Sequence, residues 1–592
     1  MCGILGCNYL TNNFENALSL LQKRGPDYQN SININNNLIG HARLSIIDLD
    51  KEANQPMVFD DIIIVFNGEI YNYKQLIIDE NLYCSTKSDT EVLIRLYQKY
   101  DINFLNKLNG AFSFVLYDTN KNRFFGARDR YGKKPFYYFH KDNKFIFSSL
   151  IKPIISILDY TPKLNKIALS QYLQYFVPLE PHTFYTDIYK LPKSSYFIYE
   201  NNQFEIKKYY KIKTYKKIYD ENIALNKIEE KLFNAVEQRM VSDVEIGSLL
   251  SGGIDSSFIS TIFSKLSNKS IKTFSIGYDE HTKYSELKYA SLVAKSIKSE
   301  HTEVILNKKQ YIDSIEYVFN SLEEPHADHA AIPLYTLVSE INKQGIKTVF
   351  SGEGSDEIFL GYDNYKKFYD YYHFKASLSP EQKFFLKTNI SSAKSTTKEL
   401  DYLKRVLQDE QIYTSFGEIF THNQKKLLFK KVPSYKLEKE KADCVDWMSY
   451  IDMKIWLGES LLSKVDKILM SHSIENRNPF LDFNLVDLLY SIDSNIKLGN
   501  TNKYLLKQIA KKYIPKEIIN RPKKGFNTPY HEWINDEFKD KILIDILEAN
   551  VHHNLFNETY IKSIYANSKN NKSKQHIYAL WVFSKWYIKN YV

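Results

Sequence analysis

Cys2, the second residue of the chain, stands where a cysteine can act as a nucleophile without a separate base. If Met1 is removed, the Cys2 thiol lies beside a free α-amine with a pKa of roughly 7.7 to 8.0, which can accept the thiol proton. One residue would then supply both nucleophile and base. A cysteine in isolation is more often a buried structural residue, so the prediction depends on the residues that could surround it.

Three further positions could build a pocket for an amide substrate around this thiol. Arg43 offers a planar guanidinium that suits an α-carboxylate, and Asn67-Gly68-Glu69 ends an apolar strand with an amide, a flexible backbone N–H and a carboxylate. Asp89 adds a second carboxylate. Each has a common structural alternative: a surface ion pair, a hairpin turn and a helix cap, respectively. Their combination with Cys2 favours catalysis.

A second group of residues, Leu249 to Ser257, reads LLSGGIDSS and joins a predicted strand to a predicted helix. Its two glycines and its hydroxyls allow backbone N–H groups and a helix N-terminus to cradle phosphate. The Gly-Lys-Ser/Thr ending of a Walker A loop is absent. A second turn, Ser351 to Glu357 (SGEGSDE), places three carboxylates at the end of another strand. The structural alternatives are a tight turn and an acidic surface turn.

The second half of the chain predicts the elements that would bring these two turns together. Strands alternate with helices, which implies a doubly wound parallel sheet with its ligands at the carboxyl ends of the strands. We expect helices over residues 223–240, 256–266, 285–295 and 333–345, and strands over 244–250, 272–276, 300–305 and 347–350. Residues 365–447 are polar and helical without motifs, as part of the helical elaboration toward the C-terminus.

The first half predicts a different architecture. Short apolar runs separated by polar turns indicate sheet strands at residues 61–66, 111–117, 123–127 and 144–148, with a helix over 89–97 that Asp89 would cap. This pattern is typical of an α/β sandwich. We therefore predict a two-domain α/β protein, with a first domain at residues 1–210, a linker at 211–222 and a second domain at 223–592.

Composition restricts the class of protein further. The 592 residues are 43% hydrophobic and 25% charged, which is typical of globular chains and excludes a mainly disordered one. The net charge of +9 comes without a long basic block, so no nucleic-acid partner is predicted. The strongest apolar run, residues 62–66, is far too short for a membrane helix. Four cysteines without CxxC spacing, and a start without a basic signal region, predict a cytoplasmic protein.

The motifs of the first half resemble the class II glutamine amidotransferase domain: MCGI at Met1, RGPD at Arg24, HARLS at His41, NGEIYN at Asn67 and SDTE at Ser88. The resemblance implies an N-terminal nucleophile hydrolase fold, an αββα sandwich, in which Cys2 attacks the side-chain amide of glutamine. Asn67 and the Gly68 N–H would form the oxyanion hole. Glu69 and Asp89 would bind the ammonium group, and the carboxylate would be held by the strip Arg43, Leu44, Ser45, Ile46 and Ile47.

The two turns of the second half resemble the SGGxDS loop of the PP-loop ATP pyrophosphatases and the SGEGxDE segment of asparagine synthetases. Similar segments follow as far as RPKKGF at Arg521. The resemblance implies that Asp255 and Asp356 hold Mg²⁺ and that Glu353 lies near an acyl adenylate. Lys503 would stabilise the activated carboxyl and the departing pyrophosphate. The implied ATP contacts are Leu250, Ser251, Gly252, Gly253, Asp255, Ser256, Ser257, Ile276, Ser351 and Gly352.

The two resemblances together imply a glutamine-dependent asparagine synthetase: glutamine, aspartate and ATP give asparagine, AMP, pyrophosphate and glutamate. The sequence departs from the usual pattern at Leu360, where glycine is commoner, and at His329, Asn476 and Asn478. A sugar uronate or another carboxylate therefore remains an alternative acceptor. A non-catalytic sensor would be expected to lose Cys2 or the SGGxDS loop, and both are intact. The family also implies a homodimer, and transfer of ammonia between the two sites predicts an internal passage.

Overall fold

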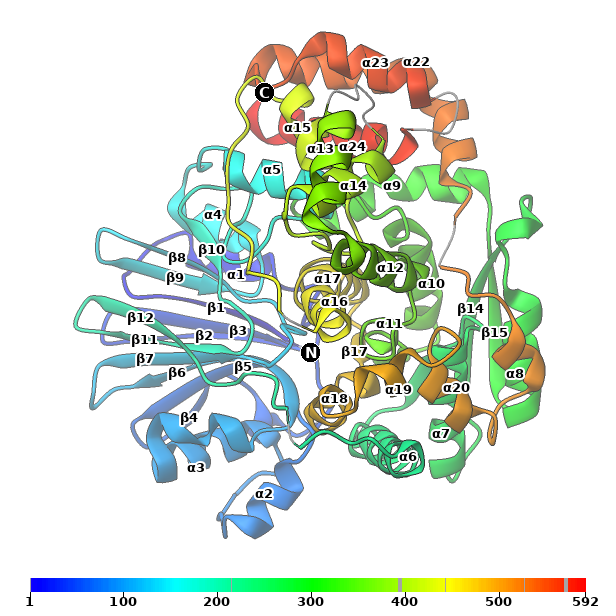
Figure 1. The fold of residues 1–592 in the computed structure, drawn as a ribbon. Coiled ribbons are helices and arrows are strands. Elements are labelled where there is room, and N and C mark those ends of the chain that lie inside the picture. Colours follow the sequence, from blue (N-terminus) through cyan, green and yellow to red (C-terminus); the bar gives the residue numbers. More distant parts are fainter. Residues whose placement is uncertain (1, 215, 392–396, 442, 526–527, 569–572) are drawn as a thin grey trace.

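Two six-stranded antiparallel sheets stack face to face in the first third of the chain, at the left of Figure 1. The computed structural model describes residues 2–214, 216–391, 397–441, 443–525, 528–568 and 573–592. The first sheet has the order β10-β8-β9-β1-β3-β2, and its strands are β1 (Gly3–Cys7), β2 (Tyr28–Ile34), β3 (Asn37–Arg43), β8 (Tyr137–Lys141), β9 (Lys144–Ser148) and β10 (Ile188–Lys190). The second has the order β12-β11-β7-β6-β5-β4, with β4 (Met57–Phe59), β5 (Ile62–Ile70), β6 (Gly110–Asp118), β7 (Arg123–Arg128), β11 (Ser195–Glu200) and β12 (Gln203–Lys208).

Helices cover both outer faces of this sandwich, which confirms the αββα prediction. They are α1 (Phe14–Ser19), α2 (Tyr73–Asp79), α3 (Asp89–Tyr100), α4 (Ile151–Leu158) and α5 (Lys166–Tyr175). Side chains of α1 and α4 pack on β1 and β9, and those of α3 pack on β5 and β6. A third, aromatic core fills the space between the sheets, with Val65, Val115, Phe145 and Phe197 among its members. Because successive side chains of a strand point to opposite faces of the sheet, each strand contributes both to the core between the sheets and to a core under the helices.

Two details near the predicted site differ from expectation. Asn67, Gly68 and Glu69 do not follow a strand but lie inside β5, opposite residues 113 to 111 of β6. The cap of α3 is Ser88, whose Oγ accepts the Thr90 N–H, so the predicted cap was one residue too far along. A pattern of apolar residues cannot mark the end of a strand whose polar residues point into a buried pocket.

A five-stranded parallel sheet forms the centre of the second half, with the order β15-β14-β13-β16-β17. Its strands are β13 (Ile246–Leu249), β14 (Lys272–Tyr278), β15 (Glu300–Leu306), β16 (Thr348–Phe350) and β17 (Glu475–Arg477). The strand order reverses between β13 and β16, which lie side by side. Such a reversal point is where a doubly wound sheet binds its ligand. The predicted parallel sheet is confirmed.

Helices pack on both faces of this sheet. They are α6 (Glu221–Gln238), α7 (Ile254–Leu266), α8 (Leu287–Ile297), α9 (Lys308–Leu322), α10 (Ala331–Lys343) and the short α11 (Ser355–Ile358). The cores place α6, α7 and α8 on one face and α9 and α10 on the other. Sequence reasoning missed α9 and otherwise located each of these longer helices within two residues of its observed ends.

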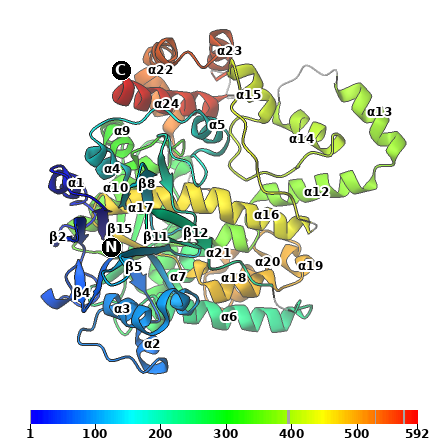
Figure 2. The same cartoon turned by 90° about the vertical axis from the view of Figure 1, so that its left-hand side faces the viewer.

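The remaining helices build an arm and a cap around the sheet. Figure 2 shows an arm at the right made of α12 (Asp363–Ser377), α13 (Pro380–Ser391) and α14 (Lys398–Leu407). The cap at the top of Figure 1 consists of α22 (Tyr530–His553), α23 (Glu558–Ser568) and α24 (Lys574–Tyr591). The short α15 (His422–Leu428) packs against the cap. At the other end of the second half, α18 (Phe483–Tyr490), α19 (Ser494–Leu498), α20 (Tyr504–Ala510) and α21 (Lys516–Asn520) pack near α6 and α7.

One continuous helical rod runs beside the sandwich and connects these parts. It consists of α16 (Cys444–Asp452), a π-helical segment (Met453–Leu461) and α17 (Leu462–Met470). A π-helix of this length is rare, and π turns occur frequently at functional sites.

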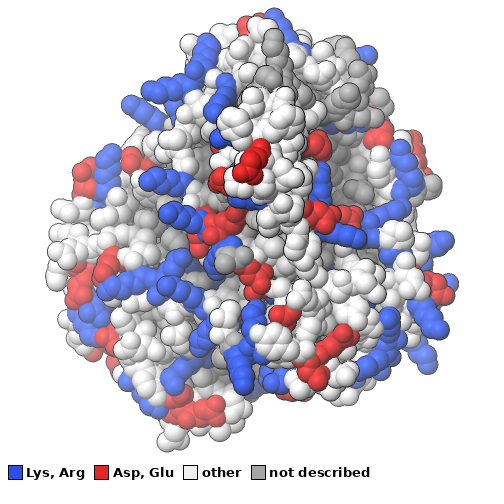
Figure 3. Space-filling model, viewed as in Figure 1, with Lys and Arg blue, Asp and Glu red and all other residues white. Residues whose placement is uncertain are grey.

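The side of the molecule drawn in Figure 3 carries charges of both signs. On the side shown in Figure 3, blue and red side chains are interspersed over both halves of the molecule. In the part of the chain that the structure describes, no helix has both the length and the apolar character needed to cross a membrane.

Candidate active sites

Cys2 lies at the bottom of a pocket between the start of β1 and the inner end of β5. The Cys2 N–H donates to Asn67 Oδ1 at 3.2 Å, and its carbonyl accepts from Arg24 Nε at 3.1 Å. Burial raises the pKa of the Cys2 thiol. The thiol therefore needs a base when substrate arrives, and the α-amine that trimming of Met1 would expose is at the same residue.

The backbone at Gly68 comes very close to the neighbouring strand. A Cβ atom at Gly68 would lie 2.2 Å from the Ala111 carbonyl oxygen, and φ at this position is +156°. Only glycine fits there. Asn67, beside it, is fully buried, and its Nδ2 donates to Ser113 Oγ at 3.4 Å. This long bond leaves the amide donor weakly occupied, as a developing oxyanion would require.

Arg43 reaches the same pocket from the end of β3. Its guanidinium donates to the Asp50 carbonyl at 3.0 Å, to Asn54 Oδ1 at 2.6 Å and to the Asp48 carbonyl. These bonds fix the plane of the guanidinium and use three of its five N–H donors. Donors remain for a carboxylate.

Glu69 and Asp89 bring two carboxyl groups to the opposite side of the pocket. Burial raises the pKa of Asp89 to about 7, and the Ile70 N–H that donates to Asp89 Oδ2 at 2.9 Å works against that shift. Burial, together with the carboxylates of Glu475 and Asp89, also raises the pKa of Glu69. Two buried carboxyl groups with excess negative charge are suited to bind a cation such as an α-ammonium group.

The structure brings most of the predicted glutamine residues together. Those that line the pocket are Cys2, Arg43, Leu44, Ile46, Ile47, Gly68, Glu69 and Asp89. Ser45 and Asn67 adjoin these residues: the Ser45 N–H donates to Asp27, and Asn67 Oδ1 accepts the Cys2 N–H. Sequence reasoning missed Ala53, Gln55, Phe66, Ser88 and Thr90, which also line the pocket. No sequence motif marked Gln55, because its side chain bonds the Phe66 N–H and Thr90 Oγ1, which come near it only in the folded protein.

The second site lies where β13 and β16 end side by side. The SGGxDS loop is held by its own hydroxyls: Ser256 Oγ accepts the Ser251 N–H at 3.1 Å and lies 2.9 Å from Ser251 Oγ. Gly252 has φ +74°, and a Cβ there would lie 2.6 Å from the Ala290 nitrogen. The loop then enters α7, whose N-terminus favours an anion.

The two predicted turns touch each other. A Cβ atom at Gly352 would lie 2.9 Å from the Asp255 Cβ, and Ser355 Oγ donates to Asp255 Oδ1 at 2.6 Å. Leu250 is buried directly after β13, and Ile276 is buried inside β14. Ser257 is buried in the first turn of α7, and Gly253 and Asp255 line a basic pocket. Ser351 is tied to β17, because its N–H donates to the Arg477 carbonyl at 3.1 Å.

Lys503 joins the carboxylates of the two turns. Its Nζ lies 2.5 Å from Asp255 Oδ2 and 2.8 Å from Asp356 Oδ1. Burial opposes the charge of Lys503, but the two carboxylates outweigh it and raise the pKa of the lysine. Among the described residues no cluster of three or more His, Cys, Asp and Glu is arranged for a metal ion. Asp255 and Asp356 meet at one cation, however, and Mg²⁺ is often held by one or two carboxylates together with phosphate oxygens. The residues present fit that group.

Glu353, in the second turn, lies near the ion pair of Lys464 and Asp328. Burial raises the pKa of Glu353, with Lys464 acting against the shift. Lys464 in turn forms an ion pair with Asp328 at 2.6 Å. A carboxyl group with a raised pKa is suited to proton transfer near neutral pH.

The pocket beside Lys503 contains cations that sequence reasoning did not assign. Arg521 Nη1 donates to the Gly252 carbonyl at 2.8 Å, and Lys523 forms an ion pair with Asp356. Lys507 and Lys524 line the same pocket. The run RPKKGF indicated a concentration of positive charge. Its contact with the SGGxDS loop could not be predicted, because the two segments lie more than 260 residues apart in the sequence. These cations suit a polyphosphate.

A pocket lined by a buried cysteine in an αββα sandwich, together with a glycine-rich loop at the end of a parallel strand, defines a two-site α/β enzyme. Residues 1–210 match the glutamine amidotransferase domain, and residues 227–588 match asparagine synthase. The chain belongs to the asparagine synthase family and is an ATP-dependent ligase.

Relatives cover nearly the whole chain. The protein is 32% identical over 551 residues to asparagine synthetase [glutamine-hydrolyzing] 1 of Bacillus subtilis, which spans 90% of this chain and 86% of the relative. It is 35% identical over 393 residues to a putative asparagine synthetase of Methanocaldococcus jannaschii, covering 61% of this chain and 76% of that one. An amidase of Gibberella zeae is 27% identical over 604 residues, covering 91% and 88%.

Proposed function

We propose that the protein is a glutamine-dependent asparagine synthetase that acts in the cytoplasm. Residues 1–210 would release ammonia from glutamine, residues 211–222 would link the halves, and residues 223–592 would activate and amidate aspartate. The observation that carries the proposal is the meeting of Asp255, Asp356 and Lys503 in a chain that also buries Cys2 beside two carboxyl groups. The proposed homodimer rests on the family alone.

Glutamine hydrolysis would use the residues of the first pocket. Arg43 binds the α-carboxylate, and Glu69 with Asp89 binds the α-ammonium group. Cys2 Sγ adds to the side-chain carbonyl carbon, and the Gly68 N–H and Asn67 Nδ2 stabilise the oxygen that becomes negative. Ammonia leaves with the thiol proton that the Cys2 α-amine had accepted, and water then cleaves the thioester to glutamate.

Amide formation would use the second site. A carboxylate oxygen of the acceptor attacks the α-phosphorus of ATP, and pyrophosphate leaves toward Lys503 and Lys523. Asp255 and Asp356 would hold Mg²⁺, which supplies positive charge to the phosphates when it is bound. Ammonia then attacks the acyl carbon, Glu353 removes a proton, and AMP departs.

Aromatic residues near the second site suggest a second candidate for the acceptor. His329 stacks on Tyr530 with ring centroids 3.9 Å apart, and its Nδ1 lies 2.9 Å from Thr528 Oγ1. This aromatic pair lies next to Asp328, the partner of Lys464. A sugar uronate is therefore the second candidate, and the relative named as an amidase shows that the family includes other activities.

Product analysis by mass spectrometry tests the proposal. Purified protein would be incubated with MgATP and amide-labelled glutamine, with and without aspartate. Labelled asparagine and AMP formed in equal amounts are expected. If labelled ammonia appears while aspartate yields neither AMP nor asparagine, the assignment of aspartate is overturned and sugar uronates become the substrates to test.

A further inference from the structure

Arg477 belongs to β17 of the second half, yet its guanidinium faces the glutamine pocket of the first half. Its Nη2 lies 3.7 Å from Glu69 Oε2, and neither atom has a hydrogen-bond partner among the described residues. Both side chains are buried, with exposed fractions of 0% for Arg477 and 5% for Glu69. A buried ion pair at this distance therefore crosses the boundary between the two halves.

The remaining donors of Arg477 hold its guanidinium in place. Nη1 donates to the Arg239 carbonyl at 2.7 Å and to the Val241 carbonyl at 2.6 Å, and Nε donates to Glu475 Oε1 at 2.7 Å. These bonds fix the plane of the guanidinium and aim Nη2 at Glu69. The backbone of Arg477 is fixed as well, because its carbonyl accepts the Ser351 N–H.

The charges around Glu69 explain why this cation matters. Three buried carboxyl groups, those of Glu69, Asp89 and Glu475, lie close together, and Glu475 is already bonded to Arg477. Burial and the neighbouring carboxylates raise the pKa of Glu69, and the charge of Arg477 acts against that shift. A neutral carboxyl group has little attraction for an ammonium group.

We propose that Arg477 is a positioning residue for glutamine recognition, which keeps the Glu69 carboxyl group in place and oriented toward the α-ammonium group of the substrate. The inference rests on the proposed role of Glu69 in the glutamine site. It means that the second half of the chain completes the specificity of the first. Arg477 itself does not line the pocket and acts only through Glu69.

The test compares glutamine with 4-carbamoylbutanoate, which has the same amide and carboxylate but no α-amino group. The ratio of the two kcat/KM values for amide hydrolysis measures recognition of the ammonium group alone. For Arg477→Gln we expect this ratio to fall at least tenfold, and for Arg477→Lys about threefold. A purely structural role would lower both values equally and leave the ratio unchanged.

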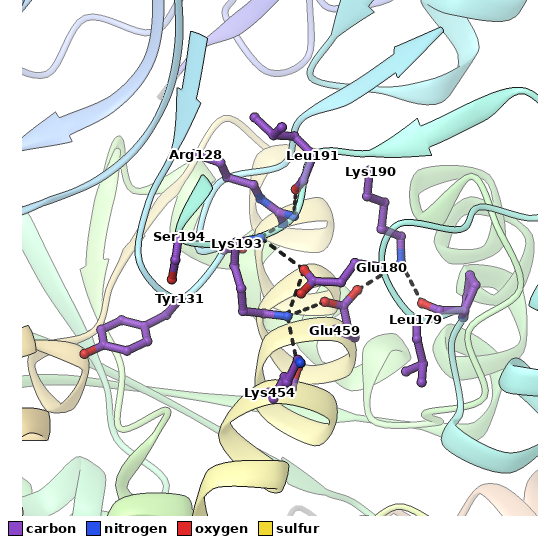
Figure 4. Close-up of polar contacts among 12 residues, drawn as sticks. Arg128, Tyr131, Leu179, Glu180, Lys190, Leu191, Lys193, Ser194, Lys454 and Glu459 are labelled. Atoms are coloured by element: carbon purple, nitrogen blue, oxygen red, sulfur yellow. Dashed lines mark hydrogen bonds and ion pairs between the residues drawn. The ribbon is translucent and has the colours of Figure 1, made fainter. Parts of the chain in front are cut away.

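Glu459 provides a matched control, because it forms another buried ion-pair cluster across the same boundary (Figure 4). Its carboxylate lies 2.5 Å from Lys193 Nζ and 3.2 Å from Lys190 Nζ, and Lys193 also pairs with Glu180 at 3.0 Å. Glu459→Gln should lower the melting temperature and leave the ratio within twofold of the wild type.

Three outcomes separate the possibilities. An unchanged ratio in Arg477→Gln, or an equal fall in Glu459→Gln, overturns the inference. If thermal unfolding shows that Arg477→Gln does not fold, Arg477→Lys decides, and a ratio within 1.5-fold of the wild type overturns it. If the wild-type protein hydrolyses neither substrate, the proposed glutaminase activity fails first, which is a distinct result.

Discussion

Arg24 and Asp466 form a buried ion pair that links Cys2 to the second half of the chain. Arg24 Nη1 lies 2.8 Å from Asp466 Oδ2, and Arg24 Nε donates to the carbonyl of Cys2. Asp466 lies in α17, two residues after Lys464, which pairs with Asp328 beside Glu353. One helix therefore supports groups of both candidate sites.

Replacement of Asp466 by Asn should destabilise the protein, because it leaves the Arg24 charge buried without a counterion. We expect the free energy of unfolding in urea to fall by about 3–5 kcal/mol. Lys347→Met is the matched control, since the pair of Lys347 with Asp27 also joins the halves but is about one-third exposed. Its effect should remain below about 1 kcal/mol. Equal effects of the two variants would contradict this interpretation.

Replacement of Cys2 by Ala should abolish glutamine hydrolysis and leave amide synthesis from added ammonium chloride within about twofold of the wild type. The reason is spatial, because Cys2 lies in the first pocket and the ATP loop lies in another. AMP release with ammonia or with glutamine as nitrogen donor measures both activities. A variant that still used glutamine would show that another group is the nucleophile.

Replacement of Gly352 by Ala should block AMP formation and spare glutamine hydrolysis. The added methyl group would meet the Asp255 Cβ at 2.9 Å and the Ser256 nitrogen at 3.0 Å, so the two turns must separate. Gly345→Ala is the control: nothing lies within 4 Å of its Cβ, and its positive φ should cost only about 1 kcal/mol of stability. Normal AMP formation by Gly352→Ala would show that the contact is dispensable.

The preference for glutamine over 4-carbamoylbutanoate should depend on pH. Burial raises the pKa of Asp89 to about 7, so Asp89 is ionised above that pH and neutral below it. The ratio of the two kcat/KM values should therefore fall about tenfold from pH 8 to pH 6, because kcat/KM reports ionisations of the free enzyme. Asp89→Asn should remove this dependence. A flat wild-type ratio would contradict the assignment.

Leu360 shows how a departure from the family pattern can be absorbed by packing. Its φ of +56° lies in the left-handed region that favours glycine. The side chain is 4% exposed and packs in a cluster with Tyr175, Tyr362 and Trp456. In Leu360→Gly, the cavity should destabilise the protein more than relief of backbone strain stabilises it. We expect the free energy of unfolding in urea to fall by about 1–3 kcal/mol. A stabilised variant would contradict this account.

The sequence predicted the parts of the fold that depend on local patterns. Alternation of strands with helices located β13 to β16, and the glycine turns located both loops, because these features depend on neighbouring residues. Lys503 was a candidate because of its motif, whereas its bridge to Asp255 and Asp356 depends on the folding of distant segments. The contacts of Lys523, Arg477 and Gln55 depend on such folding as well. Residues 365–447 carried no motif, yet Tyr365, Tyr402 and Tyr413 form an aromatic core there.

The π-helical segment Met453–Leu461 sets the phase of everything that follows it in the rod. Each residue of an α-helix turns the chain by about 100°, and Lys464 and Asp466 point to different sites only at their present rotation. Removal of one residue from the segment would turn both side chains together and uncouple both from their partners. The length of the π-helical segment thus determines the rotation of α17 about its axis. We therefore expect the segment to tolerate a substitution far better than a deletion.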